Sequence, residues 1–304
     1  MKAVLLLLAA TLLPVLVAAV GLPLFLASRD DFGALQTQAE RGNAAAQYSI
    51  GWRYDDGEGV PVDDAEAVKW YRLAAEQGYP AAEYSLGVMY ANGEGVLAND
   101  VEAVKWYRIA AGHGDAKAQY SIGWRYLNGR GVPQDDAEAA TWYLKAGEQG
   151  IAMAQLALGM MYDIGRGVPQ NDAEAVRWYR LAGEQGSAAA QHNLGIMYRQ
   201  GRGVPQDYVE AHMWLNLAAS RESGPKAKSF AEDRNTIAVR MTPQQISEAQ
   251  RLARDWNAKP WDELRGQLDV WNSCCTPTAG SKPSEPNDQA TAARLHDAVD
   301  LTLR

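Results

Sequence analysis

The chain has 304 residues and a formal net charge of −8, from 29 basic and 37 acidic residues. No basic patch stands out, so the sequence argues against nucleic acid as a partner. The only cysteines are the adjacent Cys274 and Cys275, whereas a disulfide framework requires spaced pairs. We interpret them as two free thiols in a C-terminal tail, although pairing with each other or with another chain stays open.

Residues 1–29 predict an export segment. Lys2 is followed by no charged residue until Arg29, a run longer than the roughly 7–15 apolar residues of a signal peptide. It reaches the roughly 20 residues that span a bilayer, and an uncleaved anchor is therefore favoured. Small residues near positions 19–21 leave signal cleavage as the alternative, which would give a secreted or periplasmic protein. In both cases Lys2 on the cytoplasmic side places the remainder on the periplasmic or extracytoplasmic side.

Residues 30–41 predict a capping helix, and residues 42–221 then repeat one pattern five times. Each copy is 36 residues long and opens on a glycine, at Gly42, Gly78, Gly114, Gly150 and Gly186. A period of this length is the signature of a solenoid, in which neighbouring units bury each other's apolar faces. Each copy predicts two helices.

The first helix of the first copy carries Ala46, Ile50 and Tyr54 on one stripe. Gly51 lies inside this helix, where glycine costs about 1 kcal/mol relative to alanine. Because the same position is glycine in all five copies, we expect a close approach between the backbones of neighbouring helices.

The second helix begins at an Asx cap, Asp63, followed three residues later by Glu66. This spacing is typical of a capping box, in which the glutamate reaches back to the cap. One face of the helix is predicted to be apolar, and it comprises Ala67, Trp70, Tyr71 and Ala74.

Between the two helices lies "YDDGEGVPVDD", residues 54–64, which resembles a Ca²⁺ loop in its acidity. The position of Asp55 becomes Ala91, Leu127, Asp163 and Arg199 in the other copies, and calcium requires oxygen ligands at fixed positions. Only the pattern Gly-x-Gly-Val, here Gly57 and Gly59, and the Asx cap persist. The segment is therefore predicted to be a turn, with its acidity as a solvated feature of the first copy.

The pattern Ala-x-x-x-Leu/Ile-Gly-x-x-Tyr, then Gly-x-Gly-Val, then Ala-x-x-Trp-Tyr-x-x-Ala-Ala resembles the Sel-one-like repeat family, relatives of tetratricopeptide solenoids. The resemblance implies an all-α, right-handed α/α superhelical solenoid and a role in protein–protein interaction and complex assembly. The structural signature in the first copy comprises Gly51, Tyr54, Gly57, Gly59, Asp63, Glu66, Trp70 and Tyr71.

Residues 222–258 predict C-terminal capping helices, one around 226–240 and one starting at Thr242, with Pro243 in the first turn and Gln245 closing a capping box. Residues 259–304 predict a tail. In it, Trp261, Leu264, Leu268 and Trp271 are expected to form a short amphipathic helix that docks on the array, and the composition from about residue 276 predicts disorder.

No catalytic motif is recognisable, and the sequence predicts neither an enzyme nor a cofactor. His192 and His212 lie in the two helices of the fifth copy, but a metal site would need a third ligand, and a core histidine is the favoured interpretation. A cysteine-rich branch of the resembled family is associated with β-lactam binding or hydrolysis. Its repeats carry cysteine pairs that this array lacks, so an envelope hydrolase of β-lactamase-like or peptidoglycan-related type is only the alternative.

The first helices carry a second apolar face opposite the core stripe. A helix that is apolar nearly all round is either fully buried or lines a groove. In related solenoids the first helices line the concave surface, and Tyr, Trp and Arg dominate binding hot spots. We therefore predict a membrane-tethered scaffold that binds a protein or peptide, with a purely structural spacer as a further alternative. The candidate contact residues are Tyr48, Trp52, Arg53, Tyr84, Tyr120, Trp124, Arg125 and Met160.

Overall fold

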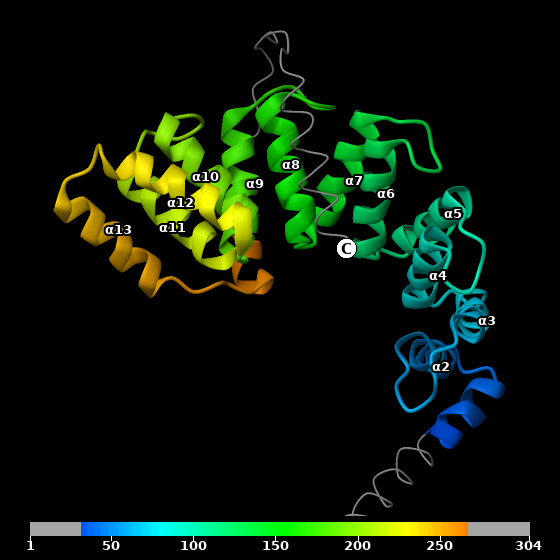
Figure 1. Cartoon of the computed structure of the whole chain (residues 1–304). Coiled ribbons are helices and arrows are strands. Elements are labelled where there is room, and N and C mark those ends of the chain that lie inside the picture. The colour runs from blue at the N-terminus through cyan, green and yellow to red at the C-terminus, as the bar shows by residue number, and fades with distance from the viewer. Residues whose placement is uncertain (1–31, 267–304) are drawn as a thin grey trace, which may run out of the picture. The chain divides into compact units, whose positions relative to one another are not determined.

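The computed structural model describes residues 32–266, and every regular element in this range is a helix (Figure 1). The chain divides into two compact units, Met1–Asp115 and Ala116–Arg304. The described part of the first unit starts with helical residues 32–40 and contains two repeats. Their helices are α2 (Ala44–Asp56), α3 (Asp64–Ala75), α4 (Pro80–Asn92) and α5 (Asp100–Gly112).

The second unit contains three repeats and the helices that follow them. The repeat helices are α6 (Ala116–Asn128), α7 (Asp136–Glu148), α8 (Ala152–Ile164), α9 (Asp172–Glu184), α10 (Ala188–Gln200) and α11 (Tyr208–Arg221). After them come α12 (Gly224–Ala238), α13 (Pro243–Asp255) and helical residues 261–266. The predicted fold of five 36-residue helix pairs with flanking helices is thereby confirmed.

The helix boundaries follow from the cap residues. The Asp63 carboxylate accepts the backbone N–H of Glu66 at 3.0 Å, and Gly57 ends α2 in the left-handed region at φ +77°. At α13 the predicted capping box is complete, since Thr242 and Gln245 each bond the other's backbone. The predicted return bond from Glu66 is replaced, because its carboxylate pairs with Lys69 one turn further along α3.

The glycine inside each first helix makes room for a side chain of the second helix in the same repeat. A Cβ on Gly51 would lie 2.7 Å from the ring of Tyr71, and one on Gly159 would lie 2.5 Å from the ring of Tyr179. The expected close approach between neighbouring helices is present, and a Cβ on Gly123 or Gly195 would also lie 3.2 or 3.1 Å from a backbone carbonyl oxygen of the second helix. The nearest contact is a side chain, because a tyrosine ring, or Leu215 in the fifth repeat, packs directly against the glycine.

Glutamine pairs, one member of each buried, link the repeats within each unit. In the second unit, Gln155 donates to the Gly147 carbonyl at 2.9 Å and accepts from Gln185 at 2.7 Å. In the first unit, Gln47 donates to the Ala39 carbonyl and accepts from Gln77 at 2.6 Å. These bonds satisfy amide groups that would be costly to bury unpaired, and they hold consecutive helix pairs in register.

The segment after α13 lies against the repeats of the second unit. The Lys259 backbone N–H donates to the Glu184 carbonyl at 2.8 Å, and the Trp261 ring covers Gly150. Leu264 is fully buried. Leu268, Trp271, Cys274, Cys275 and the export segment 1–29 lie outside the described residues. Within 32–266, no helix is both long and apolar enough to cross a membrane.

Candidate partner-binding site

The Gly-x-Gly loop is a joint between repeats as well as a turn within one. Its second glycine lies against the first residue of the second helix in the preceding repeat. A Cβ on Gly95 would lie 2.2 Å from the carbonyl oxygen of Asp64, and one on Gly167 would lie 2.1 Å from that of Asp136. Because the neighbouring atom is backbone, only glycine fits, and its φ values of +63° and +70° require glycine independently.

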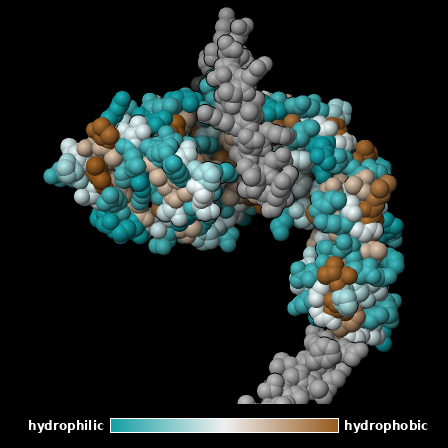
Figure 2. Space-filling view, in the orientation of Figure 1, coloured by the Kyte–Doolittle hydropathy of each residue, from teal (hydrophilic) through white to brown (hydrophobic). Residues whose placement is uncertain are grey.

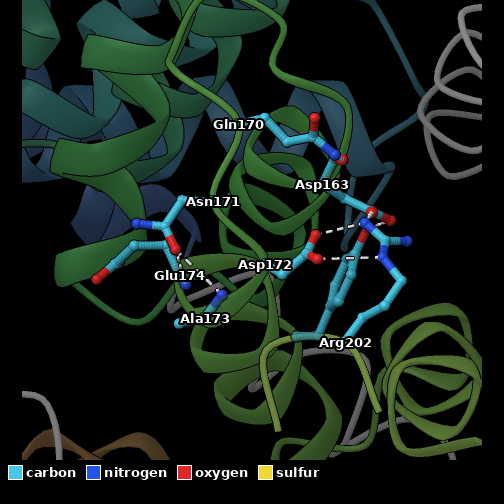
Figure 3. Close-up of polar contacts among 8 residues, drawn as sticks. Asp163, Gln170, Asn171, Asp172, Ala173, Glu174 and Arg202 are labelled. Atoms are coloured by element: carbon cyan, nitrogen blue, oxygen red, sulfur yellow. Dashed lines mark hydrogen bonds and ion pairs between the residues drawn. The ribbon is translucent and has the colours of Figure 1, made fainter. Parts of the chain in front are cut away.

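In the second unit, the arginine between the two glycines reaches back to the preceding repeat. Arg166 donates to both carboxylate oxygens of Asp136 at 2.8 Å. Figure 3 shows the next junction, where Arg202 lies between Asp163 and Asp172. Its Nη2 lies 2.6 Å from Asp163 Oδ1, and its Nε lies 3.2 Å from Asp172 Oδ2.

The acidic residue at the end of the first helix has a partner that the sequence did not reveal. Asp55 accepts a hydrogen bond from the Tyr71 hydroxyl at 3.0 Å, and Asp163 accepts one from Tyr179 at 3.3 Å. Burial is the largest influence on Asp55 and raises its carboxyl pKa, and the Tyr71 bond opposes that shift. The prediction that the acidity of this loop is solvated is therefore wrong for Asp55.

Burial of the ring raises the Tyr179 pKa well above its usual range, so this phenol keeps its proton and donates a hydrogen bond to Asp163. In the third repeat the acid is replaced by Leu127, and the fully buried Tyr143 hydroxyl has no hydrogen-bond partner. The Asp–Tyr pair is thus present only where the sequence keeps both members.

The remaining residues of the predicted signature are structural. Tyr71 is fully buried, while Tyr54 and Trp70 are half-buried against Ile50 and Ala46. Asp63 and Glu66 hold the start of α3, as described above.

The predicted contact residues on the first helices occupy two positions of the repeat. The tyrosine register comprises Tyr48, Tyr84 and Tyr120, and its rings pack on the second helix of their own repeat. Tyr48 lies 5.6 Å from Tyr71 and Tyr84 lies 5.8 Å from Tyr107, measured between ring centroids. Tyr120 repeats this arrangement with the ring of the second helix and is buried. The recurrence shows that these rings pack on the second helix of their own repeat, and Tyr48 also lies 5.3 Å from Tyr79 at the start of the next repeat.

The tryptophan register lies four residues further along each first helix and comprises Trp52, Trp124 and Met160. Its two tryptophans are partly accessible to solvent. Trp52 is 41% exposed on α2, and Trp124 is half-buried on α6. Met160 on α8 is only 9% exposed. The face in Figure 2 is mostly hydrophilic, with hydrophobic residues scattered singly or in small groups.

The two predicted arginines differ in their surroundings. Arg53 is half-buried, with its guanidinium 5.9 Å from the centre of the Phe32 ring. Arg125 is 5% exposed and lies 5.3 Å from the centre of its neighbour, the Trp124 ring. Arg125 was expected to flank an open groove. Instead it is buried, and its guanidinium packs against the Trp124 ring.

The histidines of the fifth repeat have separate partners. His192 Nε2 lies 2.9 Å from Asp233 on α12, and its ring stacks on Phe230. His212 is buried, its Nδ1 has no hydrogen-bond partner, and burial followed by the charge of Arg234 lowers its pKa. Among residues 32–266, no group of three or more histidine, cysteine or acidic residues is arranged to hold a metal ion.

Sequence reasoning missed the arginines of the loop as contact residues. The available signal was the change from Glu58 and Glu94 in the first two copies to arginine in the later copies. Two of these arginines, Arg166 and Arg202, each pair with an aspartate 30 residues earlier. The pairing becomes visible only when two consecutive repeats are placed side by side.

Paired antiparallel helices, capped by Asx residues and joined by a glycine turn, define a helical-repeat scaffold, an architecture suited to protein interaction. A scan against known families matches the Sel1 repeat at residues 44–79, 80–115, 116–151, 152–187 and 188–223. The chain therefore belongs to the Sel1 repeat family, whose members are generally non-catalytic scaffolds.

Two solved structures resemble the chain over most of its length. A Sel1 repeat protein from Oxalobacter formigenes is 34% identical, with a TM-score of 0.65, over 77% of this chain and 97% of that one. A protective antigen from uropathogenic Escherichia coli with an SLR fold is 31% identical, with a TM-score of 0.67, over 84% of this chain. The match spans 53%, about half, of the antigen. A search of curated proteins returned no match.

Proposed function

We propose that this chain is an exported scaffold that binds a protein or peptide through the exposed parts of its first helices. The observation that carries this proposal is Trp52, a large apolar side chain that is 41% exposed in the middle of α2. Tyr48 and Arg53 lie beside it in the sequence and are half-buried. Tryptophan and arginine are the residues that most often dominate the energy of protein interfaces.

Within each unit, the tyrosine register forms the base of this surface and the tryptophan register forms its contact layer. The tyrosines already pack on the second helix, and a partner would gain little by displacing them. Trp52 in the first unit and Trp124 in the second have ring area left to bury, and burying apolar surface contributes about 25 cal/mol per Å².

The test compares two apolar residues of nearly equal exposure on different helices. Leu73 on α3 is 44% exposed and belongs to the second helix of the same repeat. Partners captured from a cell extract by the wild-type chain should be lost with Trp52→Ala and retained with Leu73→Ala. Circular dichroism confirms that both variants fold. If a folded Trp52→Ala variant captures the same proteins in the same amounts, the proposed surface is refuted.

We also propose that residues 1–29 tether the scaffold to a membrane, with the repeats on the periplasmic or extracytoplasmic side. The support is the uncharged run between Lys2 and Arg29. Mass spectrometry of the mature protein tests it. A peptide that contains Met1 supports an uncleaved anchor, whereas a mature chain that starts near residue 20 or 22 shows a cleaved signal.

The scaffold is proposed to have no catalytic activity of its own. A β-lactamase-like hydrolase would need an asymmetric reactive group, and the repeats offer none of the paired cysteines of the branch associated with that activity. Incubation of the purified chain with a chromogenic β-lactam checks this. Turnover above the background rate would contradict the proposal.

A further inference from the structure

The last junction of the second unit reverses the charges of the junction before it. Between the fourth and fifth repeats, Asp163 and Asp172 hold Arg202. Thirty-six residues later in the sequence, Asp163 is replaced by Arg199 and Asp172 by Tyr208.

The place of Arg202 is taken by Arg240, which follows α12 as Arg202 follows α10. Arg240 Nη1 lies 3.3 Å from the Tyr208 hydroxyl, to which it donates. The two aspartates and one arginine of the earlier junction are therefore replaced by two arginines and one tyrosine.

A pocket opens at this position. Its volume is about 240 Å³, and it is lined by Arg199, Gln200, Tyr208, Thr236, Ile237 and Arg240. Ile237 is 1% exposed and gives the pocket an apolar wall. Ligand pockets for drug-sized molecules have about 300–1,000 Å³, so this one has room for a single side chain.

The pocket keeps unneutralised positive charge. Asp233 pairs with Arg199 at 3.3 Å, and it shares its carboxylate with His192 at 2.9 Å. No carboxylate within residues 32–266 forms an ion pair with Arg240, which donates a hydrogen bond to the Tyr208 hydroxyl. The pocket therefore has two arginines, Arg199 and Arg240, and only one neighbouring carboxylate, Asp233. It is cationic, although the chain as a whole has a net charge of −8.

We propose that this pocket binds the carboxylate of an aspartate or glutamate side chain from a partner protein. The incoming carboxylate lies in the pocket beside the Tyr208 hydroxyl, and Arg240 holds it as Arg202 holds Asp172 one repeat earlier. Arginine suits this task because its planar group donates two parallel hydrogen bonds to a carboxylate. The pocket shares no residue with the surface of Trp52 and Trp124, so this inference goes beyond the proposed function and does not depend on it.

The test titrates the full-length chain with the blocked peptide Ac-Ala-Asp-Ala-NH₂ and, in parallel, with Ac-Ala-Asn-Ala-NH₂ at constant ionic strength. Binding is followed by NMR through the side-chain Nε–H signals of Arg199 and Arg240. The acidic peptide should shift both signals to saturation. The asparagine peptide should bind at least about tenfold more weakly, because arginine forms a stronger hydrogen bond with a charged carboxylate than with a neutral amide.

Two variants locate the binding. Arg240→Gln removes the cation and should weaken the acidic peptide by about tenfold or more. Tyr208→Asp restores the acid of the preceding junctions, which should pair with Arg240, abolish peptide binding and leave the melting temperature unchanged or higher. Tyr208→Asp therefore keeps the test decisive if Arg240→Gln fails to fold. The control is Arg254→Gln on α13, an exposed arginine outside the pocket lining, which should bind as the wild type does.

Three results would overturn the proposal. The first is an equal response to the aspartate and asparagine peptides. The second is peptide binding that persists in a folded Tyr208→Asp variant. The third is inorganic phosphate saturating the same two signals at a lower concentration than the acidic peptide, which would assign the pocket to a phosphate group instead.

Discussion

In the second unit, Arg166 and Arg202 pair with aspartates of the preceding repeat, whereas in the first unit the same loop position holds Glu94. Gly95, next to Glu94, lies against the backbone carbonyl of Asp64, while the Glu94 carboxylate accepts a hydrogen bond from Asn92 at 3.2 Å. The backbone contact is the same in both units. The difference shows that the glycines set the joint and that the charged residue only adjusts its strength.

The glutamine pairs differ between the units in a similar way. Gln119 and Gln155 accept from Gln149 and Gln185 in the second unit. In the first unit, the equivalent pair in the second repeat is Glu83 and His113, which lie 2.8 Å apart. Glu83 is 1% exposed, so a carboxyl and an imidazole replace two amides at a position of equal burial. The two units thus carry groups of different charge at two equivalent positions, the loop residue and this buried pair.

The largest expected effect comes from the glycine of the joint. Gly167→Ala places a Cβ 2.1 Å from the Asp136 carbonyl, and the backbone of one repeat must move. The matched control is Gly59→Ala in the first repeat, where nothing lies within 4 Å of the added Cβ. Gly59→Ala should cost only the left-handed strain of about 1–2 kcal/mol, and Gly167→Ala at least twice as much. Urea unfolding measures both, and equal costs would show that the contact between repeats is unimportant.

The next effect concerns the cation at the same joint. Arg202→Ala leaves Asp163 and Asp172 facing each other without a countercharge, at an expected cost of about 1–3 kcal/mol. Arg251→Ala on α13 is the control, because its pairs with Glu248 and Asp255 are exposed to solvent and should contribute little to stability. If thermal unfolding shows the two variants to be equally stable, Arg202 is a surface charge without a structural role.

A third comparison uses the buried tyrosines. Tyr71→Phe removes the bond to Asp55 in the first unit and should cost about 0.5–1.5 kcal/mol. Tyr143→Phe removes a hydroxyl that has no partner, and it should be neutral or stabilising. Thermal unfolding of the two variants checks this. A loss of stability in Tyr143→Phe equal to that in Tyr71→Phe would mean that this hydroxyl is satisfied after all.

The sequence predicted what a single repeat determines. The period, the Asx caps and the apolar stripes depend on residues that are near each other in the chain, and the helices begin where Asp63 and Thr242 predicted. The contact of Arg202 with Asp163 depends on residues 39 apart, and it requires the relative placement of consecutive repeats. No spacing rule within one repeat contains that information.

The candidate contact residues were harder to predict, because the first helix is apolar nearly all round. Periodicity shows which residues share a face, but it does not show how deeply a neighbouring helix covers that face. Met160 and Trp124 occupy the same register, yet the first is 9% exposed and the second is half-buried. The pocket beside Tyr208 depends on where α12 packs, and the repeat pattern ends before that helix.

The pH dependence of stability distinguishes the fifth repeat from the first four. Burial lowers the pKa of His212, so the unfolded chain binds protons more readily than the folded chain between the lowered value and about 6.5. Stability should therefore fall as the pH drops below about 6.5. The first repeat has Val68 at this position, and His212→Val should weaken the dependence. Melting temperatures at about pH 8 and about pH 5 test it, and an unchanged difference in the variant would exclude His212 as the cause.

The smallest expected effect is a gain of stability in the first unit. Glu94→Arg gives the second repeat the cation that Arg166 and Arg202 provide later, and it should pair with the partly exposed Asp64. An ion pair of this exposure contributes about 0.5 kcal/mol, and added salt should reduce the gain.

Glu58→Arg is the matched control for Glu94→Arg, since it makes the same charge change in the first repeat, where Gly59 meets no neighbour. A gain in melting temperature for Glu94→Arg alone would show that the arginine acts across the junction. An equal gain in both variants would mean that relief of the general negative charge of −8, and not a specific pair, stabilises the chain. The charge reversal between the two units would then be a difference in composition without a structural consequence.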